Sequence, residues 1–160
     1  DMDLSVPSGL TLSDFKTVLS NNLSDKNKIF EQSAEYFYKA EQKYKVNGIF
    51  LASIGIHESA WGTSKIANDK NNLFGFTAYD SDPYNSATSF DNYENAINKV
   101  AEVLSTKYLH VAGTKISDEL TATGTYFNGT TAKSVNVRYA SDTGWADKVF
   151  NYMQYLYNKL

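Results

Sequence analysis

The residue best suited to acid–base chemistry is Glu58, near the end of the stretch 49–62. The first half of this stretch is apolar on every side, which is typical of a helix that crosses a core. A carboxyl group at such a buried helix end, next to Trp61, is costly to ionise, so its pKa should rise. A raised pKa would let Glu58 act as a general acid near neutral pH. The alternative is an ordinary surface glutamate at the end of a helix.

Further carboxylates could supply a second reacting group. Hydrolysis of a glycosidic bond uses one protonated carboxyl group and a second group that stabilises the cation or activates water. Separations of about 5–5.5 Å suit retention of configuration, and roughly 6.5–9.5 Å suits inversion. The candidates are Asp80, Asp82, Asp91, Glu94 and Asp142. Each could instead form a turn or cap a helix, as Asp142 could do for the last helix.

Motifs for metals and nucleotides are weak or missing in the sequence. His57 and Glu58 begin like the HExxH zinc motif, but position 61 is tryptophan and His110 is the only other histidine. The run from Asp80 to Asp82 begins like a calcium loop, without its glycine and closing glutamate. Phosphate-binding loops and nucleophile elbows are also missing. We therefore expect no metal and no cofactor.

The composition indicates one ordinary globular domain. Of 160 residues, 42% are apolar and 21% are charged, and the chain has no cysteine. The net charge is -3 without runs of like charge, which argues against nucleic-acid binding. We find no signal peptide and no apolar run long enough to span a membrane. The chain starts at Asp1 rather than methionine, so we expect a fragment of a longer precursor.

The elements that would position Glu58 are mostly helices. Apolar spacings of three and four predict helices after Thr11, from Ser24 or Asp25 to about Tyr44, through 49–62 with Gly62 as terminator, at 92–109, at 131–137, and from Asp142 or Thr143 onward. Short helical turns are predicted at 64–69 and, at most, near 117–120. Aromatic runs at 73–79 and 87–90 predict a hairpin. The prediction is an α+β fold in which Glu58 lies where a small hairpin lobe meets a helical body, beside a groove.

Three segments carry a resemblance to a known family. They are HESAWGTS at 57–64, NNLFGF at 71–76 followed by AYD at 78–80, and YASD at 139–142 continuing to Trp145. Their order and spacing resemble the catalytic domain of the glycoside hydrolase family 73 endo-β-N-acetylglucosaminidases, bacterial autolysins that cut peptidoglycan. The resemblance runs from about residue 25 to residue 158, and the strings and the 12 tyrosines look most like clostridial autolysins.

The resemblance implies a lysozyme-like α+β fold, with a mostly helical lobe and a small antiparallel β lobe flanking a substrate cleft. Residues 1–160 would be one catalytic domain, with 1–24 as a lead-in and short helix and 73–90 as the β lobe. Glu58 would be the general acid, and Tyr139 would lie near the cleaved bond. The second carboxylate would come from the β lobe, which offers Asp80, Asp82 and Asp91 without singling one out.

The resemblance also implies a set of sugar-binding residues. They are Trp61, Asn72, Phe74, Gly75, Tyr79, Asp142 and Trp145. Several relatives carry a smaller residue where Trp61 stands, so the pocket beside Glu58 is expected to differ in width. From the residues alone, Trp145 could be core or a platform for sugar rings.

The implied activity is cleavage of the β-1,4 bond between N-acetylglucosamine and N-acetylmuramic acid in the glycan strands of peptidoglycan. The alternatives are a muramidase or lytic transglycosylase on the same fold, and a non-catalytic wall-binding module. We expect a secreted, wall-associated domain that is monomeric and binds neither nucleic acid nor membrane. Wall-binding repeats are expected elsewhere in the precursor, and cell separation is one role that such cleavage could serve.

Overall fold

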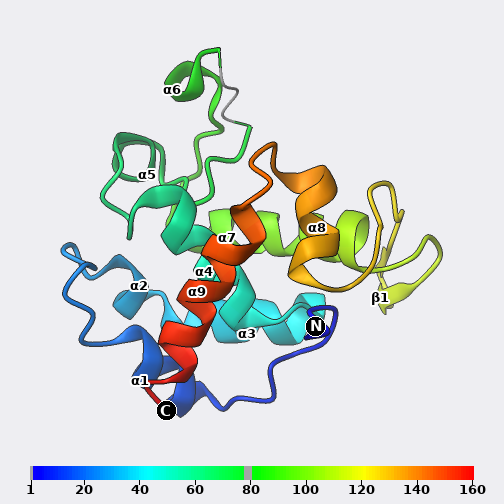
Figure 1. The fold of residues 1–160 in the computed structure, drawn as a ribbon, viewed down its shortest axis with the longest axis horizontal. Coiled ribbons are helices and arrows are strands. Elements are labelled where there is room, and N and C mark those ends of the chain that lie inside the picture. The colour runs from blue at the N-terminus through cyan, green and yellow to red at the C-terminus, as the bar shows by residue number, and fades with distance from the viewer. Residues whose placement is uncertain (1, 78–80) are drawn as a thin grey trace.

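The computed structural model describes residues 2–77 and 81–160 and is mostly helical, with one small antiparallel pair of strands (Figure 1). In chain order the elements are α1 (Leu12–Leu19), α2 (Ile29–Gln32), α3 (Ala34–Tyr44), α4 (Gly48–Ser59), α5 (Lys65–Lys70), α6 (Pro83–Ser86), α7 (Tyr93–Val103), the π-helix η1 (Leu104–Leu109), β1 (Lys115–Ser117), β2 (Leu120–Thr121), α8 (Ala132–Tyr139) and α9 (Trp145–Tyr157). The predicted fold class is confirmed.

The centre of the helical body is α4. The Asn47 side chain begins the helix by accepting a hydrogen bond from the Phe50 N–H at 2.9 Å. Every residue from Gly48 to Ile56 is buried. The helices α3 and α9 pack against it, and Figure 1 shows α9 crossing in front of it. The predicted buried helix is therefore confirmed, and it ends in the segment that carries Glu58.

The end of α4 differs from the prediction. The helix stops at Ser59, and Ala60, rather than Gly62, is the left-handed residue that ends it, with φ of 50°. Trp61 and Gly62 are also left-handed, at 58° and 74°. The Ser59 hydroxyl accepts from the Gly62 N–H at 2.8 Å, which holds this turn. Left-handed backbone costs about 1–2 kcal/mol per non-glycine residue, so the packing around the turn must offset strain immediately after Glu58.

A buried carboxylate joins the N-terminal segment to the start of α4. Glu41 in α3 is fully buried and accepts hydrogen bonds from the N–H groups of Ser8 at 2.7 Å and Gly48 at 2.8 Å. The continuous helix predicted from about 25 to 44 is instead divided at Ser33 into α2 and α3. The apolar stripe that led to that prediction is nevertheless buried, with Phe30 and Phe37 among its members.

Replacing Glu41 with alanine should lower the free energy of unfolding by about 3 kcal/mol or more. The change leaves the buried Gly48 N–H and the partly buried Ser8 N–H without their side-chain acceptor, and an unsatisfied buried donor costs about 1–3 kcal/mol. Urea denaturation of the variant and the parent measures the difference. Glu35→Ala on the same helix is the control, because Glu35 is half exposed and pairs only with Lys39. Equal losses in the two variants would contradict the assigned contribution of Glu41.

The hairpin predicted within 73–90 is wrong for the described residues. Residues 73–77 form turns, and the segment 81–90 contains α6 and no strand. Gly75 and Thr77 have positive φ, at 59° and 60°, which interrupts an extended strand. The two segments still lie side by side, since the Thr88 N–H donates to the Phe76 carbonyl at 3.0 Å. In Figure 1 the part carrying α6 extends away from the helical body.

The two strands lie elsewhere, in the part of the chain where at most a short helix was expected. β1 and β2 pair antiparallel, with Lys115 opposite Thr121 and Ser117 opposite Leu120. The helix predicted at 92–109 is present as α7 followed by η1. Asp142 does not cap the last helix, because α9 begins at Trp145 after Gly144. No helix among the described residues is long and apolar enough to cross a membrane.

Candidate active site

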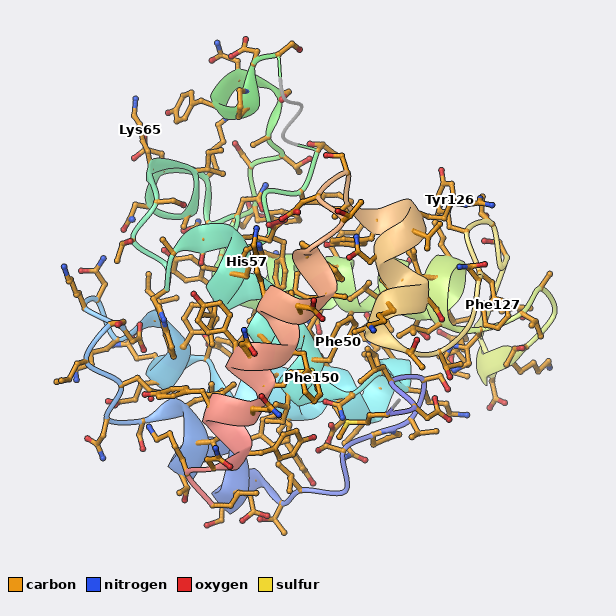
Figure 2. All side chains as sticks on the ribbon, in the orientation of Figure 1. Phe50, His57, Lys65, Tyr126, Phe127 and Phe150 are labelled. Carbon is orange, nitrogen blue, oxygen red and sulfur yellow. The ribbon has the colours of Figure 1, made fainter. Side chains whose placement is uncertain are left out.

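A groove of about 500 Å³ lies where the end of α4 meets the turn at 74–77 and the segment between α8 and α9. Glu58 and His57 line it from α4, and Phe74 and Gly75 line it from the turn. Figure 2 shows His57 at the end of α4 that faces the α5–α6 segment. The remaining walls come from Val103 at the end of α7, Tyr108 in η1, the segment 139–142 and Trp145. The groove is therefore assembled from four parts of the chain.

Glu58 is a carboxyl group of strongly perturbed acidity in the groove. Its side chain is 30% exposed, so a ligand can reach it, while the surrounding protein removes most of the water. This desolvation raises the pKa of the Glu58 carboxyl from 4.5 to about 7. At neutral pH a large fraction of Glu58 is therefore protonated and can donate a proton.

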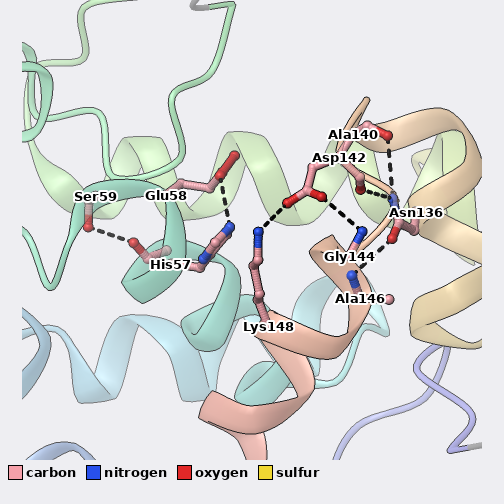
Figure 3. Close-up of polar contacts among 10 residues, drawn as sticks. His57, Glu58, Ser59, Asn136, Ala140, Asp142, Gly144, Ala146 and Lys148 are labelled. Atoms are coloured by element: carbon pink, nitrogen blue, oxygen red, sulfur yellow. Dashed lines mark hydrogen bonds and ion pairs between the residues drawn. The ribbon is translucent and has the colours of Figure 1, made fainter.

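Figure 3 shows His57, Lys148 and Asp142 near Glu58. The His57 Nε2 lies 3.8 Å from the Glu58 Oε1. Burial, and then the nearby charge of Lys148, lowers the pKa of His57, so its ring is neutral at neutral pH and does not draw Glu58 into an ion pair. Lys148 instead binds the Asp142 carboxylate at 2.6 Å. Within residues 2–77 and 81–160, the groove thus gives Glu58 no partner stronger than the neutral His57 ring.

The Asp142 carboxylate has two fixed partners. Besides Lys148, it accepts the Gly144 N–H at 2.9 Å, and these contacts lower its pKa. Asp142 and Glu58 therefore share one groove in opposite protonation states, a division that acid–base sites require. Asp142 was expected to bind sugar, and the structure places it in the groove, where its exposed carboxylate can accept hydrogen bonds from hydroxyl groups.

Tyr139 forms the wall next to Glu58 and is supported by aromatic rings. Its ring centroid lies 5.0 Å from that of Trp145 and 5.3 Å from that of Tyr108. Burial, followed by the negative charge of Glu58, raises the pKa of the Tyr139 hydroxyl, so this group stays protonated and can donate. Trp145 is only 2% exposed and also packs on Phe50. Trp145 is therefore the floor beneath Tyr139 rather than an open platform for a sugar ring.

Trp61 does not line the groove, contrary to the prediction. Its indole packs edge-on against Phe30, Tyr152 and Tyr155, with ring centroids 5.8, 6.2 and 6.0 Å away. The left-handed backbone at Ala60 and Trp61 turns the chain away from Glu58 after α4 ends. The apolar surroundings expected for Glu58 are present, but Tyr139, Trp145 and Phe74 supply aromatic walls that the sequence attributed to Trp61.

Asn72 lies behind the wall of the groove and holds that wall in place through hydrogen bonds. Its side chain is 1% exposed, and the carbonyl oxygen accepts from the N–H groups of Phe74 and Phe76 at 3.1 and 3.0 Å. Its amide group donates to the carbonyls of Phe76 and Thr88 at 2.9 and 3.0 Å. All four bonds organise the 72–76 turn, so Asn72 shapes the wall and does not face a ligand. Phe74 and Gly75 lie on the groove, as predicted.

The two predicted β-lobe acids that the structure describes, Asp82 and Asp91, do not lie in the groove with Glu58. Asp82 is exposed and accepts from the Asn85 amide at 3.1 Å, and Asp91 is exposed at the other end of the lobe. Neither lines the groove. Asp80 and Tyr79 lie outside the described residues. Among the described residues, no three or more of His, Cys, Asp and Glu form a group suited to holding a metal ion.

Seven residues that line the groove were not predicted from the sequence as site residues: His57, Phe76, Thr77, Val103, Tyr108, Ala140 and Ser141. Tyr108 appeared there only as part of a helical apolar stripe, and its place in the groove depends on η1, whose wider turn rotates the residues after Val103. His57 was considered only as a zinc ligand. Ser141 was quoted only as part of a motif. Nothing in the periodicity separates such residues from those of the core.

A reachable carboxyl group with a raised pKa, in an aromatic groove on a mostly helical body, is an arrangement that suits the general acid of a lysozyme-like glycoside hydrolase. The model of the Glucosaminidase family, described as mannosyl-glycoprotein endo-beta-N-acetylglucosaminidase, matches residues 34–158. The chain belongs to this family, which confirms the resemblance at the level of family and identifies residues 34–158 as a glucosaminidase domain.

Relatives of known sequence agree with this assignment. A putative endo-beta-N-acetylglucosaminidase of Streptococcus pneumoniae is 36% identical over 138 residues, which are 86% of this chain and 19% of that protein. A beta-N-acetylglucosaminidase of Bacillus subtilis is 29% identical over 140 residues, which are 79% of this chain and 15% of that protein. The chain thus spans less than a fifth of the length of these relatives.

Solved structures share the fold. Autolysin E of S. aureus, in complex with the muropeptide NAM-L-Ala-D-iGlu, matches with a TM-score of 0.65 at 25% identity, over 99% of this chain and 71% of that one. A catalytic mutant of the same protein, in complex with the disaccharide NAG-NAM, matches with a TM-score of 0.67 at 24% identity, over 99% of this chain and 71% of that one. The lysozyme-like architecture is thereby confirmed.

Proposed function

We propose that this domain hydrolyses the β-1,4 bond between N-acetylglucosamine and N-acetylmuramic acid in peptidoglycan, with Glu58 as general acid. The observation that carries the proposal is the Glu58 carboxyl group, which is reachable in the groove and has a pKa of about 7. Membership of the Glucosaminidase family and the muropeptide bound by Autolysin E support this substrate. Glu58 protonates the glycosidic oxygen as the bond to the anomeric carbon breaks.

The second half of the reaction has two routes. In one, the N-acetyl oxygen of the substrate attacks the anomeric carbon as the glycosidic bond breaks, and the Tyr139 hydroxyl stabilises the cyclic intermediate. Water then opens this intermediate and gives its proton to the Glu58 carboxylate. In the other, a β-lobe aspartate activates water. We favour the first route, because Asp82 and Asp91 do not line the groove and Asp142 is held by Lys148. Anomer-resolved NMR of early products separates them, since attack by the acetamido group retains configuration and direct attack by water inverts it. Inverted products, together with loss of activity in Asp80→Asn, would support the second route.

The bond specificity is tested by digesting purified peptidoglycan, reducing the products and measuring them by mass spectrometry. Reduced N-acetylglucosamine ends are the expected result. Reduced muramic ends would indicate a muramidase, and anhydro-muramic ends a lytic transglycosylase. If the domain sediments with cell walls but releases no soluble fragments, it is a wall-binding module and the proposal is wrong.

Replacing Tyr139 with phenylalanine should lower kcat by about 10²-fold, because it removes one hydrogen-bond donor from the reacting site while keeping the ring. Initial rates on peptidoglycan at several substrate concentrations measure this change. Tyr126→Phe is the matched control, because the Tyr126 ring also packs on Tyr108, at 5.2 Å, but does not line the groove. If both variants keep full kcat, the Tyr139 hydroxyl has no part in the reaction.

We also propose a cellular location for the domain. Its substrate lies outside the cytoplasmic membrane, so we propose a secreted, wall-associated location and a monomeric catalytic domain. The similarity to clostridial autolysins and the wall-binding repeats elsewhere in the precursor stay predictions. Fractionation of producing cells, followed by detection of the domain with an antibody, tests the location.

A further inference from the structure

A second hollow begins where the catalytic groove ends. It runs between α8 and α9, and we call it the α8–α9 trench. One part of about 620 Å³ adjoins another of about 250 Å³, and both are lined by Lys133, Ala146 and Asp147. Ala140 and Ser141 line both the trench and the catalytic groove. A chain leaving the groove over the 140–141 segment would therefore enter the trench directly.

The surface of the trench combines exposed apolar groups with two unpaired charges. Val137 is 65% exposed and Phe150 is 39% exposed, and Figure 2 shows Phe150 on α9. Lys133 and Asp147 carry opposite charges and line the same hollow. In the ranges 2–77 and 81–160, neither side chain has an ion-pair or hydrogen-bond partner. Such a surface suits a short ligand that carries both a carboxylate and an amine.

The ridge between groove and trench is rigid. The buried Asn136 amide donates to the Asp142 carbonyl at 2.9 Å, and its side-chain oxygen accepts the Ala146 N–H at 2.9 Å (Figure 3). Asn136 thus fixes the connection between α8 and α9 from the trench side. The two hollows keep one relative position, so a ligand could occupy both without ordering a loop.

The length of the trench fits a few residues of extended peptide. From Ala146 to Met153, α9 rises about 10 Å at 1.5 Å per residue. Three extended residues span roughly the same distance at about 3.3–3.6 Å each. In peptidoglycan a short peptide branches from the glycan beside the bond that the proposed reaction cuts. This stem offers free carboxylates and, in many walls, an amino group.

We propose that the α8–α9 trench binds the peptide stem of the strand whose glycan occupies the catalytic groove. This inference rests on the proposed function. Lys133 contacts a carboxylate of the stem, Asp147 contacts its amino group, and Val137 and Phe150 cover its small apolar side chains. The trench makes the domain prefer glycan that still carries peptide over glycan from which peptide has been removed.

The double variant Lys133→Gln/Asp147→Asn tests the proposal by comparing two substrates. One is peptidoglycan with its stems, and the other is the same glycan after an amidase has removed them. We expect kcat/KM to fall about tenfold on the first substrate and to stay unchanged on the second. The matched control is Lys115→Gln/Asp118→Asn at the β1–β2 hairpin, which removes the same two charges outside the trench.

Binding of the peptide stem to the α8–α9 trench can also be measured directly, without relying on catalytic activity. Wild-type domain labelled with ¹⁵N is titrated with the synthetic peptide L-Ala-γ-D-Glu-L-Lys-D-Ala-D-Ala. We expect shifts at the amides of Val137, Asp147 and Phe150, and weaker shifts in the double variant. Shifts confined to the catalytic groove, no shifts, or equal losses on both glycans would overturn the proposal. If the wild type cuts neither glycan, the proposed function falls, while the titration still decides whether the trench binds peptide.

Discussion

Replacing Glu58 with glutamine should lower the rate of peptidoglycan cleavage by about 10²–10⁴-fold, the usual contribution of a general acid. Glutamine keeps the shape of the side chain and cannot protonate the leaving oxygen. Release of soluble fragments from purified walls measures the rate, and circular dichroism checks the fold. The control is Glu119→Gln at the exposed β1–β2 turn, which changes the charge equally and should leave the rate unchanged. A variant at position 58 that keeps more than about a hundredth of the rate would remove Glu58 from this role.

The pH profile follows from the same residue. Because the proposed role of Glu58 requires its protonated form, activity should fall as the pH rises through the pKa of about 7. In the glutamine variant the remaining activity should lose this alkaline limb. Initial rates between pH 5 and pH 9 at constant ionic strength provide the test. An unchanged alkaline limb in the variant would assign that ionisation to another group.

The raised pKa of Glu58 should also make the free energy of unfolding depend on pH, and the direction of that dependence can be stated. The folded-state pKa of Glu58 lies above its ordinary value of 4.5, so the contribution of this group is fully present below about pH 4.5 and is lost as the pH rises through about 7. Glu58→Gln should therefore be more stable than the parent at pH 8 and similar to it at pH 4. Thermal denaturation at the two pH values measures the difference, and equal Tm differences at both would contradict the raised pKa.

Replacing Asn72 with alanine should lower both stability and activity, because Asn72 holds a wall of the groove in place. It removes four hydrogen bonds from the 72–76 turn and leaves the buried N–H groups of Phe74 and Phe76 unpaired. Unsatisfied buried groups cost about 1–3 kcal/mol each, and with partial relaxation we expect a loss of roughly 2–4 kcal/mol. Because this turn is a groove wall, kcat/KM should also fall by about tenfold or more.

Thermal denaturation and wall-cleavage rates test this prediction together. A loss of 2–4 kcal/mol corresponds to a Tm lowered by about 4 °C or more in a domain of this size. Asn72→Asp should also fail to restore the parent, because its carboxylate would face the carbonyls of Phe76 and Thr88. Asn85→Ala, at an exposed position in α6, is the control. If Asn72→Ala matches that control in both measurements, the turn does not depend on Asn72.

The sequence by itself determined the helical body, the buried central helix and the place of Glu58 at the end of that helix. These follow from local patterns, because apolar spacing identifies helices and an unbroken apolar run identifies a core helix that ends in a carboxylate. The resemblance at three short segments was enough to predict the family. Phe74, Gly75, Tyr139 and Asp142, which belong to those segments, line the groove, and their predicted roles stay predictions.

Only the tertiary structure decided which side chains surround Glu58. Trp61 is three residues from it in sequence but packs on Phe30 and Tyr152, because consecutive left-handed residues turn the chain. Tyr108 comes from η1, fifty positions away, and no local pattern marks it. The sequence predicted strands within 73–90 rather than at β1 and β2 for a related reason. The hydrogen bonds of Asn72 and the positive φ angles of Gly75 and Thr77 hold an aromatic, strand-like sequence in turns, and local propensity does not register contacts of that kind.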